Sequence, residues 1–119
     1  MTSEDLKLRS KKFALRIIKL VDALPKKSAA DVLGKQILRS GTSVAANYRS
    51  ACRARSQADF ISKITIVEEE ADETILWLEL ITEAGLVNKE LTEELLLEAN
   101  ELTAIFTASG KTAKMNKSK

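Results

Sequence analysis

The stretch FISKITIVEEEADETILWLEL, residues 60–80, decides the fold of this 119-residue chain. Its apolar side chains recur at steps of three and four residues, a spacing that places them on one face of an α-helix. Ser56, with Asp59 three residues later, has the form of a capping box at the start of that helix. Gly85 stands where a left-handed residue would end it. We therefore predict one long helix that reaches about Ala84.

Two segments before this helix show the same spacing. The first covers about residues 4–24, with Ser3 placed to cap it and Pro25 placed to end it. The second opens at residues 28–31, which also have the form of a capping box. Its apolar spacing passes unbroken through the poor helix formers at 39–43, so we predict a single helix there.

A fourth helix follows Asn88, and its apolar positions end at Phe106. With four glycines and one proline, the chain has few residues that favour turns. Short connections between long helices make neighbouring helices antiparallel. The sequence therefore predicts one all-α domain over residues 1–108, an antiparallel up-and-down four-helix bundle. A flexible, Lys-rich tail is expected at 109–119.

Charge is distributed unevenly along the chain. Residues 1–60 contain 13 Lys and Arg against 5 Asp and Glu, whereas residues 61–119 contain 6 against 12. Four cations of the second predicted helix fall within a narrow arc at 100° per residue, and two later cations extend the patch. Arginine matches phosphate oxygens with a rigid fork of N–H donors. The pattern predicts a nucleic-acid-binding surface made of Lys35, Arg39, Arg49, Arg53, Arg55 and Lys63.

A second interpretation of these cations stays open. The acidic run Glu68–Glu73 lies on the next predicted helix, and the arginines could pair with it within a subunit or across an interface. Runs of charge are more often solvated or paired than bound to nucleic acid. In this alternative, the protein is a protein–protein interaction scaffold whose arginines meet acidic residues at a subunit interface.

The third predicted helix carries more apolar residues than one bundle seam requires. A helix that is apolar around much of its circumference is buried on more than one side, which favours a homo-oligomer. The alternative is that these residues are singly exposed apolar groups, which are common on protein surfaces. The predicted oligomer interface comprises Ile61, Leu76, Trp77, Leu80 and Ile81.

The residues of catalysis and metal binding are largely missing. The chain has no histidine, so Ser-His and Cys-His pairs and imidazole ligands are excluded. Cys52, among alanines, is interpreted as a small packed residue rather than a nucleophile. We predict no catalytic residues, no metal and no cofactor, although a carboxylate-only magnesium site stays as an alternative. No signal peptide or membrane-spanning run is evident, so a cytoplasmic protein without membrane contact is expected.

Two blocks of the sequence resemble one known family. Residues 37–48 (ILRSGTSVAANY), continued by 53–56 and 60–64, and residues 69–80 (EEADETILWLEL) resemble the second and third helices of the 23S rRNA intervening-sequence proteins. The resemblance extends over about residues 6–108. Arg39, Arg53 and Arg55 match basic positions of that family.

The resemblance implies a bacterial four-helix bundle that assembles as a ring, commonly a homopentamer. A distant relative, the accessory protein of diversity-generating retroelements, forms a basic barrel that binds nucleic acid and a reverse transcriptase. The partners implied for this chain are therefore further copies of itself, RNA or DNA, and a nucleic-acid enzyme. The family has no established catalytic residues. The leading hypothesis is a non-enzymatic oligomer that binds RNA or a ribonucleoprotein through its second helix.

Overall fold

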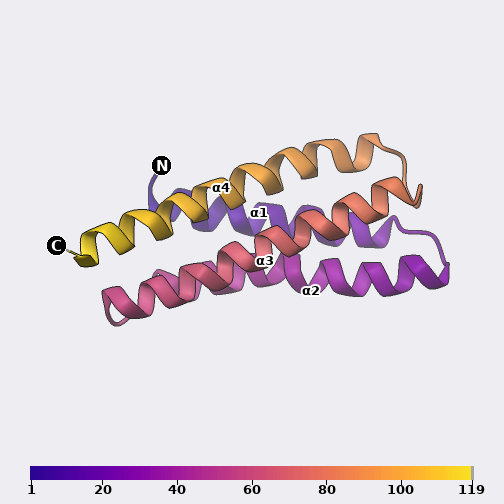
Figure 1. Ribbon diagram of the computed structural model, residues 1–119. Coiled ribbons are helices and arrows are strands. Elements are labelled where there is room, and N and C mark those ends of the chain that lie inside the picture. Colours follow the sequence, from indigo (N-terminus) through magenta and orange to yellow (C-terminus); the bar gives the residue numbers. More distant parts are fainter. Residues whose placement is uncertain (119) are drawn as a thin grey trace.

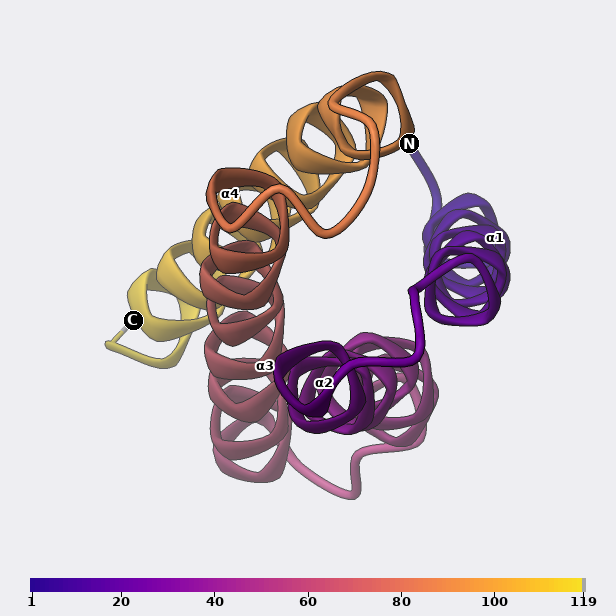
Figure 2. The same ribbon diagram turned by 90° about the vertical axis from the view of Figure 1, so that its right-hand side faces the viewer.

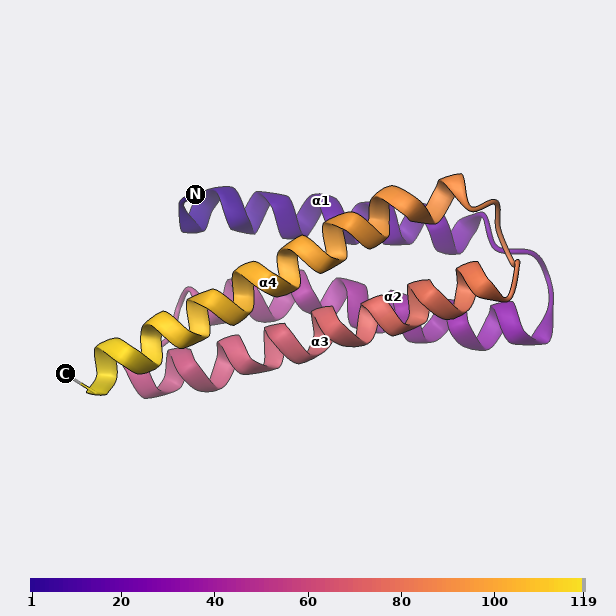
Figure 3. The same cartoon turned by 45° about the horizontal axis from the view of Figure 1, so that its top comes forward.

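The computed structural model describes residues 1–118 as four helices in an up-and-down arrangement (Figures 1 and 3). Each helix runs antiparallel to the one before it, and the bundle measures 51 × 21 × 20 Å. None of the described helices is both long and apolar enough to cross a membrane. The helices are α1 Ser3–Asp22, α2 Ser28–Ala51, α3 Gln57–Glu83 and α4 Glu90–Ser118.

Three predicted serine caps have different outcomes. At α3, the Ser56 hydroxyl accepts a hydrogen bond from the Asp59 N–H at 3.0 Å, which is half of the predicted capping box, while the Asp59 carboxylate accepts from the Arg55 N–H instead of that of Ser56. At α1, the cap is Thr2, one residue earlier than the predicted Ser3, and Thr2 forms a complete capping box with Asp5. At α2, the predicted capping box is wrong, because Ser28 is already helical and the N-cap residue has no side-chain hydrogen bond.

The connections between the helices follow simple backbone rules. Lys27, the N-cap residue of α2, is extended, and its N–H donates to the Pro25 carbonyl at 3.0 Å. This tight turn starts α2 one residue earlier than a serine cap would. After α3, Gly85 has a φ of +67°, the left-handed conformation that a glycine adopts without steric cost. Both connections agree with the antiparallel arrangement predicted from the sequence.

A single apolar core runs the length of the bundle. The tightly buried set includes aliphatic side chains from every helix and the Tyr48 and Phe106 rings, whose centroids are 5.5 Å apart. A buried polar contact lies within the α2–α3 seam, where the Thr74 hydroxyl donates to Ser40 Oγ at 2.9 Å. The largest fully buried aliphatic side chains are Ile17, Ile37, Ile64, Leu78, Ile81 and Leu102.

Helix α2 is continuous through residues 39–43, as predicted. It carries two buried glycines on the side that faces α1. A Cβ atom added at Gly41 would lie 3.0 Å from both Cγ1 and Cγ2 of Ile17, and one added at Gly34 would lie 3.0 Å from the Leu24 side chain. At Gly41 the two helices are therefore close enough that a larger side chain would displace Ile17, and at Gly34 a larger side chain would displace Leu24 in the turn after α1.

The domain boundary predicted at residue 108 does not coincide with the end of a helix. α4 continues to Ser118 and reaches past the N-terminal end of α1 (Figures 1 and 3). Gly110 and Ala113 are buried, and the Gln57 side-chain amide donates to the Ala113 carbonyl at 3.0 Å. Small residues thus let the last turns of α4 pack on the start of α3. Lys119 lies outside the described residues.

We expect Gly41→Val to destabilise the fold by about 1–3 kcal/mol, because the new methyl groups would overlap the fully buried Ile17. Urea unfolding followed by circular dichroism measures the change. Gly110→Ala is the control, since its Cβ would sit 3.5 Å from Ile64, an ordinary contact, and a helical Gly→Ala change is favourable. Equal unfolding midpoints for Gly41→Val and the wild type would contradict the close α1–α2 contact.

Candidate nucleic-acid interface

The bundle is divided into a basic half and an acidic half. Residues 1–56, which form α1 and α2, contain 13 Lys and Arg and 4 Asp and Glu. Residues 57–118, which form α3 and α4, contain 5 and 13. The end-on view shows α1 beside α2 and α3 beside α4 (Figure 2). The net charge of +2 therefore conceals two faces of opposite sign.

Three of the six cations predicted to bind phosphate have acidic partners in the same chain. The Arg39 guanidinium contacts the carboxylates of Glu70 at 2.9 Å and Glu73 at 2.6 Å, and these contacts raise the pKa of Arg39, with Glu73 as the larger cause. Lys63 lies 3.1 Å from Asp59, one turn earlier on α3. Lys35 has a longer contact of 3.5 Å with Asp31, on the exposed face of α2.

The other three predicted cations, Arg49, Arg53 and Arg55, lie at the end of α2 and in the loop that follows. All three side chains are exposed, and none forms an ion pair with another residue in the part of the chain that the structure describes. The structure therefore separates the predicted patch into a paired region at Arg39 and an unpaired region at the α2–α3 end of the bundle.

The loop after α2 is held by Asp59 in the first turn of α3. Its carboxylate accepts from the Arg55 backbone N–H at 3.1 Å and contacts the Lys63 ammonium. These two interactions, the first being larger, lower the pKa of Asp59 below its ordinary value. Asp59 thus fixes the backbone from which Arg55 projects.

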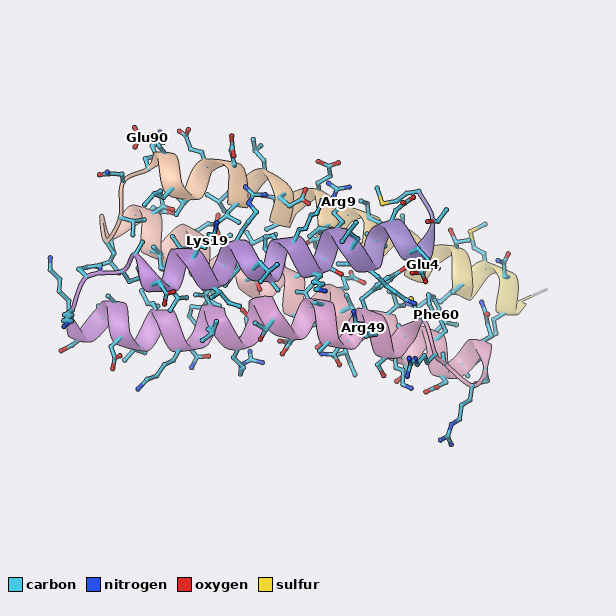
Figure 4. The ribbon with its side chains drawn as sticks, turned by 180° about the vertical axis from the view of Figure 1, so that it is seen from behind. Glu4, Arg9, Lys19, Arg49, Phe60 and Glu90 are labelled. Atoms are coloured by element: carbon cyan, nitrogen blue, oxygen red, sulfur yellow. The ribbon has the colours of Figure 1, made fainter. Side chains whose placement is uncertain are left out.

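Helix α1 supplies cations that the sequence analysis did not assign. Arg9 and Arg16 face α4, where Arg9 contacts Glu98 at 2.6 Å and Arg16 contacts Glu94 at 3.6 Å. Figure 4 shows Arg9 on the α4 side of α1 and Arg49 on the other side, between α1 and α2. Lys7 and Lys11 lie on that second side, and both line a cleft with Arg49. The sequence did contain a signal for this pair, because two lysines four residues apart lie on the same face of a helix.

The predicted oligomer residues are only partly on the surface. Leu76 and Leu80 on α3 are 47% and 41% exposed, and Ile61 and Trp77 are half-buried. Ile81 is fully buried in the chain's own core, so the prediction that it belongs to an interface is wrong. One helical turn separates Leu76 from Leu80, whereas Ile81 lies a further 100° round the helix and faces inward.

Residues that could support chemistry are sparse. Cys52 is half-buried beside the core, as its interpretation as a packing residue requires. Burial is the main cause that raises the pKa of Tyr48, with a hydrogen bond to Cys52 as a smaller one, so this phenol stays neutral. Among residues 1–118, no three His, Cys, Asp or Glu side chains come together as a metal site would need.

Comparison with known families and structures shows the family to which this bundle belongs. The family model described as 23S rRNA-intervening sequence protein matches residues 4–108. The chain belongs to this family. The match confirms the resemblance seen in residues 37–80 and covers α1 from its second residue onward and all of α2 and α3.

A solved structure supports the family assignment. A crystal structure at 1.70 Å resolution, of a protein with unknown function from the S23 ribosomal protein family of Bacteroides thetaiotaomicron, shares 40% sequence identity with this chain. The match has a TM-score of 0.83 and covers 89% of this chain and 98% of that one. No functionally curated protein matches the chain. The comparisons therefore establish the fold and the family, and the family match stops ten residues before the end of α4.

We expect Asp59→Asn to lower the melting temperature at pH 7, because the neutral amide loses the charge that stabilises the Arg55 loop and Lys63. A carboxylate whose pKa is lowered by folding stabilises the protein above its unfolded pKa, which is about 3.9. That stabilisation is lost as the pH falls through the lower folded pKa. The difference between the two proteins should therefore shrink as melts are repeated towards pH 3.

Asp72→Asn is the matched control for this substitution. Asp72 lies on the same helix, is exposed, and forms no ion pair among the described residues. Its removal changes the net charge equally and should leave the pH 7 melting temperature nearly unchanged. Equal melting of the two variants at pH 7 would show that Asp59 does not hold the loop.

Proposed function

We propose that this protein is a non-enzymatic, oligomeric bundle that binds RNA through the basic half formed by α1 and α2. The observation that carries the proposal is the exposed group of Arg49, Arg53 and Arg55, which has no acidic partner among residues 1–118. Arginines without partners expose their guanidinium N–H donors to solvent. Each guanidinium can then bind a phosphate through two parallel hydrogen bonds. A ribonucleoprotein or a nucleic-acid enzyme would present the same phosphates.

The contacts of Arg39 argue against the scaffold alternative. That hypothesis needs the arginines of α2 to meet the Glu68–Glu73 run of another subunit. Two carboxylates of that run, Glu70 and Glu73, already contact Arg39 within the same chain. Arg39 and its two carboxylates together carry a net charge of −1, so this part of the surface does not attract a phosphate. The phosphate-binding surface that we propose accordingly excludes Arg39 and Lys63 and is centred on the end of α2.

We further propose that copies of the chain associate through the outer face of α3, around Leu76 and Leu80. Both leucines lie on one side of the helix and are more than two fifths exposed, beside the half-buried Trp77. The indole N–H of Trp77 is buried and has no hydrogen-bond partner among the described residues. In the pentameric ring suggested by the family resemblance each interface is heterologous, so this face of α3 would pack against a different surface of the next subunit.

Replacing Arg49, Arg53 and Arg55 together by Gln should weaken RNA binding and flatten its salt dependence. Each cation withdrawn from a phosphate contact lowers the slope of log K against log salt by about 0.7 for a single strand or about 0.9 for a duplex, so the slope should fall by about 2–3. An electrophoretic mobility shift with structured ribosomal RNA, repeated over a salt series, measures both quantities. The control is Lys89, Lys111 and Lys117, all on the α4 side, changed to Gln with the same loss of charge. Equal weakening of RNA binding by the two triple variants would contradict the assignment of the binding surface to the end of α2.

The double change Leu76→Glu and Leu80→Glu should divide the oligomer into smaller species with unchanged helicity, because a subunit interface would have to bury two new carboxylates. Light scattering coupled to gel filtration measures the mass. Leu97→Glu with Met115→Glu is the control, since these α4 residues are 72% and 67% exposed and the charge change is equal. An unaltered mass for the Leu76 and Leu80 variant, beside a wild type larger than a monomer, would place the interface elsewhere.

A further inference from the structure

A cleft lies between the N-terminal half of α1 and the C-terminal half of α2. Its volume is about 250 Å³, roughly eight times the 30 Å³ that a water molecule occupies in the liquid. The cleft is therefore large enough for a phosphate group together with its ester oxygens. It is lined by Lys7, Lys11, Thr42, Ala45, Ala46 and Arg49.

The residues that line the cleft differ in their chemistry. Two ammonium groups from α1 and one guanidinium from α2 supply the donors. The Thr42 hydroxyl donates to the Leu38 carbonyl at 2.7 Å within α2, so it supplies none. Ala45 and Ala46 add only methyl groups, and no acidic side chain belongs to the lining.

We propose that this cleft binds a backbone phosphate of the nucleic acid, with Lys7, Lys11 and Arg49 as its ligands. The inference rests on the proposed function and adds to it a site on α1, where the sequence analysis placed no binding residue. Figure 4 shows Arg49 in the space between α1 and α2, towards the end of α1 that carries Glu4. Cations from two separate helices thus converge on one point of the surface, and they do so without acidic partners on α2.

Other basic regions of the same half do not share this arrangement. The pocket at the α1–α2 turn contains Lys26, Lys27 and Lys35, but Asp31 also lines it and contacts Lys35 at 3.5 Å. The pocket between α1 and α4 mixes Lys19 with Glu90 and Glu94. A phosphate entering either pocket would meet a carboxylate, which repels it.

One carboxylate does compete for the proposed site. Glu4 contacts the Lys7 ammonium at 2.9 Å from one turn earlier on α1, and its side chain is 80% exposed. An ammonium group has three N–H donors, so this contact leaves two of them for a phosphate. Because Glu4 is so exposed, its side chain can also turn into solvent when a phosphate binds. The charge of Glu4 should therefore weaken binding slightly.

The test compares two pairs of lysines on one helix. Lys7→Gln with Lys11→Gln removes two ligands of the cleft, whereas Lys12→Gln with Lys19→Gln removes the same charge from another face of α1. Figure 4 shows Lys19 on the α4 side of that helix, and Lys12 lies seven residues earlier on the same face. Fluorescence anisotropy of a labelled single-stranded RNA is measured over a salt series.

We expect the Lys7 and Lys11 variant to lose about 1.4 from the salt slope, at about 0.7 for each single-stranded phosphate contact, and the control pair to lose much less. We also expect Glu4→Gln to bind RNA more tightly than Glu83→Gln, an equal change of charge on α3. Equal losses for the two lysine pairs would overturn the cleft while leaving RNA binding by the wild type intact.

A second measurement separates failure of the cleft from failure of the proposed function. Inorganic phosphate is titrated into the isotopically labelled wild type, and the amide shifts of Lys11, Arg49 and Lys12 are followed. Shifts at Lys11 and Arg49 but not at Lys12 support a phosphate site in the cleft. If these shifts occur while the wild type binds no RNA at any salt concentration, the proposal that the bound phosphate comes from a nucleic acid is overturned. The ligand of the cleft is then a small molecule that carries a phosphate. If neither RNA binding nor these shifts occur, both proposals fail.

Discussion

The close contact between α1 and α2 is the constraint on which the rest of this bundle depends. It is made where Ile17 of α1 lies against Gly41 of α2, so closely that a Cβ atom at position 41 would force Ile17 to shift by a few tenths of an ångström. Gly34 repeats the arrangement seven residues earlier, against Leu24 and Val21. Seven residues are about two helical turns, so both glycines lie on one side of α2. The cost of two glycines in a helix is offset by tighter packing of fully buried side chains.

This contact also determines where charge gathers. Because α1 and α2 approach so closely, the lysines on the outer side of α1 are brought to the same surface as Arg49 of α2. The seam between α1 and α4 is different, because it is bridged by the long side chains of Arg9 and Arg16 reaching acidic residues. The arginines of α1 are therefore used to hold the bundle together, and its lysines are left at the surface. The same helix serves the structure on one side and the proposed binding surface on the other.

The sequence predicted the four helices well because apolar periodicity records burial directly. It offered the pairing of α2 arginines with the Glu68–Glu73 run as one alternative, but it could not say which arginine makes it, because side-chain partners depend on distances between helices. Arg39 and Arg49 share one arc of α2, yet Arg39 lies opposite Glu70 and Glu73 while Arg49 lies opposite Lys7 and Lys11. Nothing in the pattern of α2 alone distinguishes them.

Adjacent residues show the same limit on a finer scale. Leu80 and Ile81 are both apolar, but a rotation of 100° about α3 leaves one 41% exposed and the other fully buried. Likewise Ser28 and Ser56 each precede an acid by three residues, but the proline turn before α2 moves the helix start and removes the cap at Ser28. Sequence periodicity identifies the helices, whereas the neighbouring turn or helix decides the role of each residue.

A net charge of only +2 is compatible with binding a polyanion when the charges are separated in space. The short dimensions of the bundle are 21 and 20 Å, whereas the Debye length at physiological ionic strength is about 8 Å. A phosphate at the α1–α2 surface is therefore largely screened from the carboxylates on the far side of α3 and α4. At low ionic strength the Debye length grows to about 30 Å and the acidic half is no longer screened. The charge that governs binding in the cell is accordingly the local charge of α1 and α2, and the sum over the whole chain is a poor guide to it.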